Sequence, residues 1–257
     1  MLELLLCLYC STTTQNLTIF PDKSTDSTLN HTSYLTLCTT RLNSTQQVAG
    51  EIDYAETNVS HASIRMLARV TGASGAVAGF FTYHNDTTES DIEILTRDQG
   101  NVHYSNQPTT TDSGATVAGS SQNVTLPSSK RTWEDWHVYR LDWLSGASQW
   151  WVNGKQAASS NVNIPGAPST VILNMWSNAG PWAGSMAQGA TACLQVQWIE
   201  MAFNTSDQAA TTSKSVTCSI DKQAGKPVVS GGSTIYGTGC RIWILPHLLF
   251  LVWMLGL

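Results

Sequence analysis

The side chains best suited to chemistry are three acids in the segment Glu89-Ser90-Asp91-Ile92-Glu93. Alternate residues of a β-strand point to the same face, so a strand here places the three carboxylates side by side and turns Ser90 and Ile92 to the opposite face. Carboxylates this close repel one another, so at least one should have a raised pKa and hold its proton near neutral pH. A protonated acid beside an ionised carboxylate is what cleavage of a glycosidic bond requires.

Two other interpretations of this segment are a solvated strand face and a cation site. A Ca²⁺ ion takes six to eight oxygen ligands, usually from loops that contain Asn, Asp and Gly. The flanking segments, Phe80-Phe81-Thr82-Tyr83 and Ile94-Leu95, have instead the composition of buried strands. Burial of three acids in a sheet lowers the stability of the fold, so we expect such acids only where they have a function. This favours the catalytic interpretation.

The elements that must position these acids are short strands rich in β-branched and aromatic residues, separated by clusters of Gly, Asn, Asp, Ser and Pro. No helical period and no internal repeat is visible. Many short strands in one domain predict an all-β fold, an antiparallel sandwich or jelly roll. The predicted strands are residues 62–70, 77–83, 91–95, 136–143, 149–152, 171–176 and 194–203.

Composition excludes several classes of function. The 257 residues carry a formal net charge of −5 and no block of Lys or Arg, which argues against a nucleic-acid partner. Hydrophobic residues make up 42% of the chain, enough to bury a core and to rule out a disordered chain. The ten Trp begin only at Trp133, and such a cluster suggests a ligand with flat apolar faces, such as a sugar. No cluster of His, Cys and Asp has metal-ligand spacing, so we expect no bound metal. We also expect no cofactor and a monomer.

The sequons along the chain and the composition of its two ends suggest a secreted protein. Seven Asn-X-Ser/Thr sequons fit a glycosylated extracellular chain better than a cytosolic one. We divide the chain into a poor or truncated signal-like segment (1–20), a β-sandwich domain (21–206), a Ser/Thr/Gly-rich stalk (207–241) and an apolar tail (242–257). The small residues 230–233, the spacer up to Arg241 and the apolar tail match the pattern of a glycosylphosphatidylinositol (GPI) anchor signal. Such an anchor would be the only attachment of the protein to a membrane. The alternatives are a first buried strand at the N-terminus and, at the C-terminus, a buried helix or a misread final exon.

The cysteines show no paired Cys-X-X-Cys units with zinc spacing. In a secreted chain Cys193 and Cys218 could form a disulfide, and Cys38 could pair or stay free. The spacing alone does not decide among these pairings.

The motif and its neighbours resemble glycoside hydrolase family 16, the concanavalin A-like lectins and glucanases. Glu89-Ser90-Asp91-Ile92-Glu93 matches the Glu-X-Asp-X-Glu signature of that family, and the preceding Gly-Phe-Phe-Thr-Tyr-His resembles its fungal secreted branch. The order of later segments agrees, and the resemblance runs from about residue 45 to 206. Those later segments are 102–108, 136–143, 150–154, 173–176 and 182–184.

The resemblance implies a role for each acid and a set of sugar contacts. Glu89 corresponds to the nucleophile, Glu93 to the general acid/base and Asp91 to the residue that tunes their protonation. For substrate binding we select Trp176 and Trp182, near Asn174 at strand ends or in loops, and Tyr104 and Asn106 in the segment after the catalytic strand. In that segment His103 and Gln107 form the other alternating set. Trp136, Trp143, Trp151 and Trp198 are expected to be core or scaffold.

A second acidic segment, Glu51-Ile52-Asp53-Tyr54-Ala55-Glu56, resembles another form of the family motif. That form needs a β-bulge to return its last Glu to the cleft face. The segment is followed by a turn-like sequence and precedes the strand that should come before the catalytic one, so we do not expect it to be catalytic.

Three functions remain open. The resemblance favours a retaining endo-β-glucan hydrolase that acts on β-1,3 or mixed β-1,3/1,4 cell-wall glucans. A cell-wall transglycosylase would use the same covalent intermediate and pass it to a sugar hydroxyl instead of water. A catalytically silent carbohydrate-binding lectin would be expected to lack one of the two Glu, and both are present.

Overall fold

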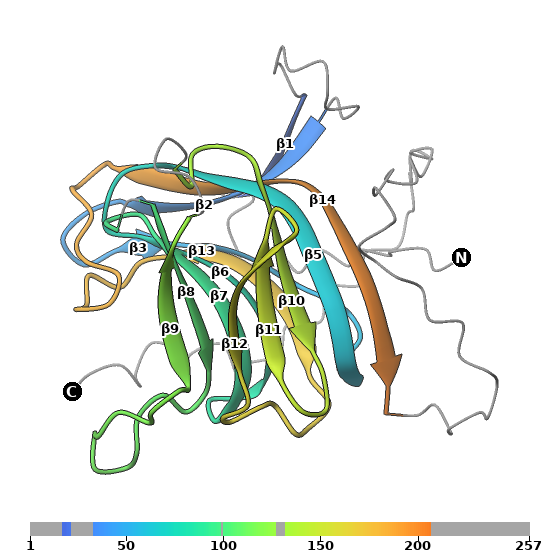
Figure 1. Cartoon of the computed structure of the whole chain (residues 1–257). Helices are drawn as coiled ribbons and strands as arrows, with labels where there is room; N and C mark the ends of the chain where they lie inside the picture. The colour runs from blue at the N-terminus through green and yellow to red at the C-terminus, as the bar shows by residue number, and fades with distance from the viewer. Residues whose placement is uncertain (1–16, 22–32, 99, 127–131, 207–257) are drawn as a thin grey trace. The chain divides into compact units, whose positions relative to one another are not determined.

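The computed structural model describes residues 17–21, 33–98, 100–126 and 132–206 (Figure 1). In these ranges the chain folds only into strands and turns, and no helix is long and apolar enough to cross a membrane. The strands are β1 (Leu17–Pro21), β2 (Ser33–Arg41), β3 (Gln47–Val48), β4 (Gly50–Asp53), β5 (Val59–Gly72), β6 (Val77–Asn85), β7 (Thr88–Leu95), β8 (Asn101–Asn106), β9 (Ser121–Thr125), β10 (His137–Trp143), β11 (Ser148–Val152), β12 (Lys155–Ser160), β13 (Thr170–Trp176) and β14 (Thr191–Thr205).

All seven segments predicted as strands are strands, and the all-β sandwich prediction is confirmed. The strands that the sequence did not reveal are polar or short, such as Ser121–Thr125 and Lys155–Ser160. Both lie at edges of sheets, where only part of a strand needs apolar side chains.

The chain divides into two units, residues 1–218 and 219–257, and every described residue lies in the first. The predicted stalk (207–241) and apolar tail (242–257) lie outside the described residues. Most of the signal-like segment 1–20 does too, but its last residues belong to β1, which pairs with β2.

Two antiparallel sheets form the sandwich (Figure 1). The large sheet has the order β1-β2-β14-β5-β10-β11-β12, with β3 also paired to β2. The small sheet has the order β4-β13-β6-β7-β8-β9, which places β7 in its interior. A strand with paired neighbours on both sides is held along its whole length, so β7 is a rigid support for functional side chains.

The core lies between the sheets and is built by alternation. Tyr139, Leu141 and Trp143 of β10 are each at most 1% exposed, and Ile92 and Ile94 of β7 face them from the small sheet. Trp133 and Trp150 are also fully buried, so part of the Trp excess is structural. Because Ile92 and Ile94 point inward, Glu89, Asp91 and Glu93 must point away from the core.

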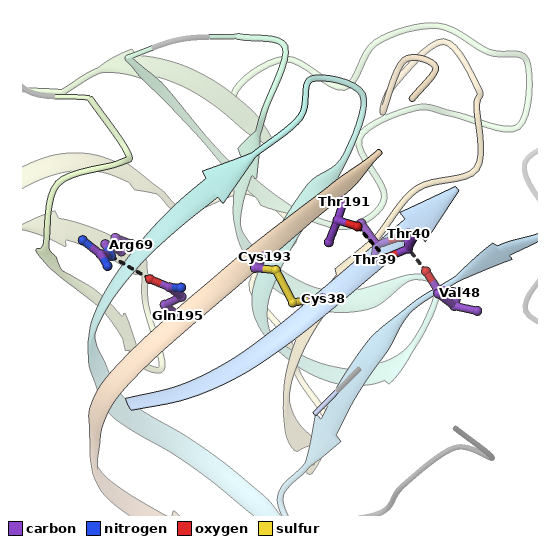
Figure 2. The surroundings of a disulfide bond; sticks show 8 residues. All are labelled: Cys38, Thr39, Thr40, Val48, Arg69, Thr191, Cys193 and Gln195. Carbon is purple, nitrogen blue, oxygen red and sulfur yellow. Dashed lines mark hydrogen bonds between the residues drawn. A yellow bond between two sulfur atoms is a disulfide. The ribbon is translucent and has the colours of Figure 1, made fainter. Parts of the chain in front are cut away.

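A disulfide joins Cys38 of β2 to Cys193 of β14 (Figure 2). The two residues are directly opposite each other in the register of these neighbouring strands. The possible pairing of Cys193 with Cys218 is therefore wrong. Strand pairing brings together two cysteines that are 155 residues apart in the sequence, and spacing alone could not show this.

Candidate active site

The three acids of β7 lie on one face of the small sheet, which we call the carboxylate face. Asp91 is 3% exposed, whereas Glu89 and Glu93 are half-buried. The backbone between Glu89 and Glu93 spans ~13 Å. Their carboxyl groups must lean toward each other to reach the ~5–5.5 Å separation that a retaining pair needs.

Burial and mutual repulsion raise the pKa of all three carboxyls. The pKa of Glu89 is raised to about 10. Desolvation is the largest cause, and the charge and the hydrogen bond of Asp91 come next. Desolvation and the charge of Asp91 raise the pKa of Glu93 to about 8, against the opposing effect of a hydrogen bond from Trp182. The pKa of Asp91 is raised by desolvation, although hydrogen bonds from Glu89, Ser105 and Gln107 favour its charged form. Glu89 and Glu93 therefore hold protons at neutral pH, in line with the expectation from the spacing that at least one of the three acids does.

Strand β8 and the residue that follows it supply the groups that fix Asp91. Ser105 Oγ donates a hydrogen bond of 2.7 Å to Asp91 Oδ2, and Gln107 Nε2 donates one of 3.3 Å to the same oxygen. Ser105 is directly opposite Asp91 in the register of the two strands. Gln107 is anchored by its backbone N–H, which donates to the carbonyl oxygen of Glu89.

The expectation that Tyr104 and Asn106 face the carboxylates is wrong. Tyr104 is opposite Ile92, is 1% exposed and belongs to the core between the sheets. Asn106 is fully buried and donates to the carbonyl oxygen of Val162. The other alternating set, which contains His103 and Gln107, lies on the carboxylate face.

Beside Glu93, on β6, Gly79 has no side chain, and neighbouring side chains occupy the place that its Cβ would take. Gly79 lies opposite Glu93 on one side and Asn174 of β13 on the other. A Cβ at Gly79 would lie 2.5 Å from Asn174 Oδ1, so a larger residue would displace that side chain. The predicted residue Asn174 is thus brought to the carboxylate face, and its Oδ1 is buried without a hydrogen-bond partner among the described residues.

The second acidic segment forms edge strand β4 and reaches the same face. Glu51 is opposite Asn174, whose Nδ2 donates to Glu51 Oε2 at 3.2 Å. Three strand spacings of ~4.8 Å separate Glu51 from Glu93, too far for the two to act on one glycosidic bond. Glu56 lies beyond the end of β4 and is exposed.

The two Trp residues selected for sugar contact lie at one end of the carboxylate face. Trp176 is half-buried and packs on a small cluster of Val77, Leu95 and Ala183. Trp182 is 41% exposed and its side chain is hydrogen-bonded to Glu93. Trp182 is therefore both next to the proposed acid/base and open to a ligand.

Sequence reasoning missed Gly79, Ser105 and Asp98, which the structure places beside the acids or their neighbours, and it named His103 and Gln107 without selecting them. The alternation within β8 was visible, but both alternating sets contain polar residues, so the sequence did not reveal which set faces outward. In the described residues no group of three or more His, Cys, Asp or Glu is arranged to hold a metal ion.

Comparisons with known proteins establish the family and the fold of the chain. A β-glucanase of Paenibacillus polymyxa is 28% identical over 141 residues, which cover 51% of this chain and 55% of that protein. The chain thus spans about half the length of this curated relative. Among solved structures, a β-glucanase of Bacillus licheniformis has a TM-score of 0.54 at 22% identity and covers 65% of this chain and 77% of its own.

A laminarinase catalytic domain of Thermotoga maritima has a TM-score of 0.56 at 15% identity and covers 73% of this chain and 80% of its own. At these identities the two solved structures establish the fold alone. The family model described as glycosyl hydrolases family 16 matches residues 19–200. Because that match spans well over half of the chain, this protein belongs to glycosyl hydrolases family 16.

Proposed function

We propose that the protein is a retaining endo-β-glucan hydrolase that acts on β-1,3 or mixed β-1,3/1,4 glucans. The observation that carries the proposal is the carboxylate trio on interior strand β7, with raised pKa values and with Trp182 exposed beside Glu93. The names of curated relatives such as the β-glucanases of Paenibacillus and Bacillus support the choice of a β-glucan as substrate.

The proposed reaction has two steps. Glu89 attacks the anomeric carbon and forms an ester, while Glu93 gives its proton to the oxygen of the leaving sugar as the glycosidic bond breaks. Glu93, now ionised, takes a proton from water, whose oxygen attacks the same carbon and breaks the ester. The ring keeps its configuration, and both side chains return to their starting states.

Asp91 is assigned the role of holding a proton for Glu89. The side chains of Glu89 and Asp91 are hydrogen-bonded to each other, so they can share one proton. Attack requires an ionised Glu89, so in the reactive state the shared proton lies on Asp91, which then donates to Glu89. Ser105 and Gln107 keep Asp91 in place for this exchange.

A panel of β-glucans tests the function. We expect purified protein to shorten β-1,3 or mixed-linkage glucan chains internally, as measured by product sizing with and without added acceptor oligosaccharide. Products longer than the substrate in the presence of acceptor would show that the activity is transglycosylation and not hydrolysis. Binding to glucan without any product from a panel that also includes chitin would contradict the enzyme and favour a lectin.

The close approach of Asn174 to Gly79 gives a prediction about substrate binding. In Gly79→Ala the new Cβ would push Asn174 away and break its hydrogen bond to Glu51. We expect KM for β-glucan to rise several-fold while the melting temperature changes little, because Asn174 is a flexible side chain. Gly146→Ala is the matched control, since nothing lies within 4 Å of a Cβ there. Equal KM values in the two variants would contradict a role of the Asn174 position in substrate binding.

We further propose that the protein is a secreted, glycosylated cell-wall or cell-surface protein of the fungal branch, with residues 242–257 replaced by a lipid anchor. The sequons and the fungal-like Phe80-Phe81-Thr82-Tyr83-His84 support this. Asn85 is exposed at the end of β6, where its Oδ1 accepts hydrogen bonds from Thr87 in the following turn, so a glycan can extend from its amide nitrogen.

Mass spectrometry of protein from wall and medium fractions tests these assignments. We expect a glycan at Asn85 and a C-terminal peptide that ends among residues 230–233. An unmodified Asn85 would contradict the glycan, and an intact peptide through Leu257 from secreted protein would contradict the anchor.

A further inference from the structure

A chain of polar contacts leads from the β7–β8 turn to the carboxylate face. Asp98 lies in that turn. Its Oδ2 is 2.9 Å from His103 Nε2, and its Oδ1 accepts a 2.7 Å hydrogen bond from Asn101 Nδ2. Asn123 Nδ2 of β9 lies 3.4 Å from Oδ2. Burial acts to raise the pKa of Asp98, but these hydrogen bonds outweigh it, so that the pKa is lowered. Asp98 is thus a fixed anion that anchors one side of the His103 ring.

The other side of the His103 ring contacts the ring of Trp182. His103 is opposite Glu93 in the register of β7 and β8, so both side chains are on the carboxylate face. The rings of His103 and Trp182 are 4.9 Å apart between centroids with an interplanar angle of 73°. Edge-to-face contact of this kind restricts the orientation of an aromatic ring. Trp182 in turn is hydrogen-bonded to Glu93.

We propose that His103, anchored by Asp98, is a positioning residue that orients Trp182 so that its indole N–H donates to the carboxylate of Glu93. The role of Glu93 as acid/base rests on the function proposed above. The orientation of Trp182 is a property of the folded chain and does not depend on that function. Trp182 is 41% exposed, and the buried cluster of Val77, Leu95 and Ala183 does not include it, so the ring contact with His103 is well placed to fix its orientation.

The orientation has a defined effect on proton transfer. A hydrogen bond donated to a carboxylate stabilises its ionised form, and the Trp182 bond opposes the burial and the charge of Asp91 that raise the pKa of Glu93. The charged groups around this arrangement are Asp98 and Arg97 from the turn and Asp91 and Glu93 from β7. Arg97 lies against Gly184, two residues from Trp182, and Asn123 on β9 is uncharged.

Kinetic pH profiles of His103→Ala and Trp182→Phe test the proposal. Activity needs a protonated Glu93, so kcat/KM should fall as the pH rises through the pKa of Glu93, about 8 in the unaltered protein. In each variant we expect this basic limb to move to higher pH by about half to one unit, and the double variant should move no further. His84→Ala is the matched control, because His84 is exposed and contacts the carbonyl oxygen of Pro168.

A role of Trp182 limited to sugar stacking would raise KM in Trp182→Phe and leave the basic limb unmoved, and this result would overturn the proposal. A shift in Trp182→Phe without one in His103→Ala would also overturn it.

A second readout does not need activity. The indole N–H signal of Trp182 in a ¹H–¹⁵N spectrum, assigned from its loss in Trp182→Phe, should shift as Glu93 titrates. In His103→Ala we expect the midpoint of this shift to rise or the coupling to disappear. An unchanged titration in His103→Ala would overturn the proposal. Failure to cleave any glucan would refute the proposed function alone, because this spectrum would still report the contact.

Discussion

Glu89→Gln and Glu93→Gln are each expected to lower kcat on β-glucan by about 10²–10⁴-fold. Each change keeps the shape of the side chain. Glu89→Gln removes the nucleophilic oxygen anion, and Glu93→Gln removes the transferable proton. Initial rates on the preferred glucan, measured with folded protein, give the result.

The same substitutions should stabilise the fold as the pH rises. The pKa values of Glu89 and Glu93 are raised in the folded state to about 10 and about 8, from an ordinary value of 4.5. Their protonation therefore contributes stability that is fully present below about pH 4.5 and is lost as the pH rises through the folded values. Gln does not titrate, so the melting temperature of each variant should exceed that of the unaltered protein by a margin that grows from pH 4.5 to 8. A margin that shrinks with pH would contradict the raised pKa values.

Glu51→Gln is the matched control for catalysis. Glu51 lies on the same face but three strands from Glu93, so its loss should lower activity far less than either change in β7. If Glu51→Gln were as damaging as Glu89→Gln with the fold intact, the assignment of the catalytic motif would be wrong.

Loss of the Cys38–Cys193 disulfide should have the largest effect on stability. The bond closes a loop with a sequence separation of 155, so breaking it frees a long stretch of the unfolded chain. For Cys38→Ser we expect a loss of about 2–5 kcal/mol in the free energy of unfolding. This corresponds to a fall in melting temperature of roughly 5–15 °C.

Reductant provides the control for this prediction. It should lower the melting temperature of the unaltered protein to that of Cys38→Ser and leave Cys38→Ser and Cys193→Ser unchanged. Activity at low temperature should persist, because the disulfide lies in the large sheet (Figure 2), whereas the carboxylates lie on β7 of the small sheet. A melting temperature that is insensitive to reductant would contradict the prediction.

The sequence by itself determined the part of the site that depends on local geometry. The two-residue period of a strand is a property of the backbone, so five consecutive residues were enough to place Glu89, Asp91 and Glu93 on one face and to turn Ile92 inward. The raised pKa values follow from the same spacing together with burial, which the apolar flanks indicated. Asn174, Trp176 and Trp182 were selected at or after the end of one apolar segment, and the structure places Asn174 and Trp176 within β13 and Trp182 in the loop after it.

Only the tertiary structure decided which residues from other strands join the acids. In β8 both alternating sets were chemically plausible, and the register with β7 placed His103 and Ser105 outward and Tyr104 in the core. The pairing of Cys38 with Cys193 likewise depends on a register between strands that are distant in the sequence. A strand carries its own alternation, but its phase relative to a neighbour is set by hydrogen bonding and core packing across the whole sheet, and no short segment contains that information.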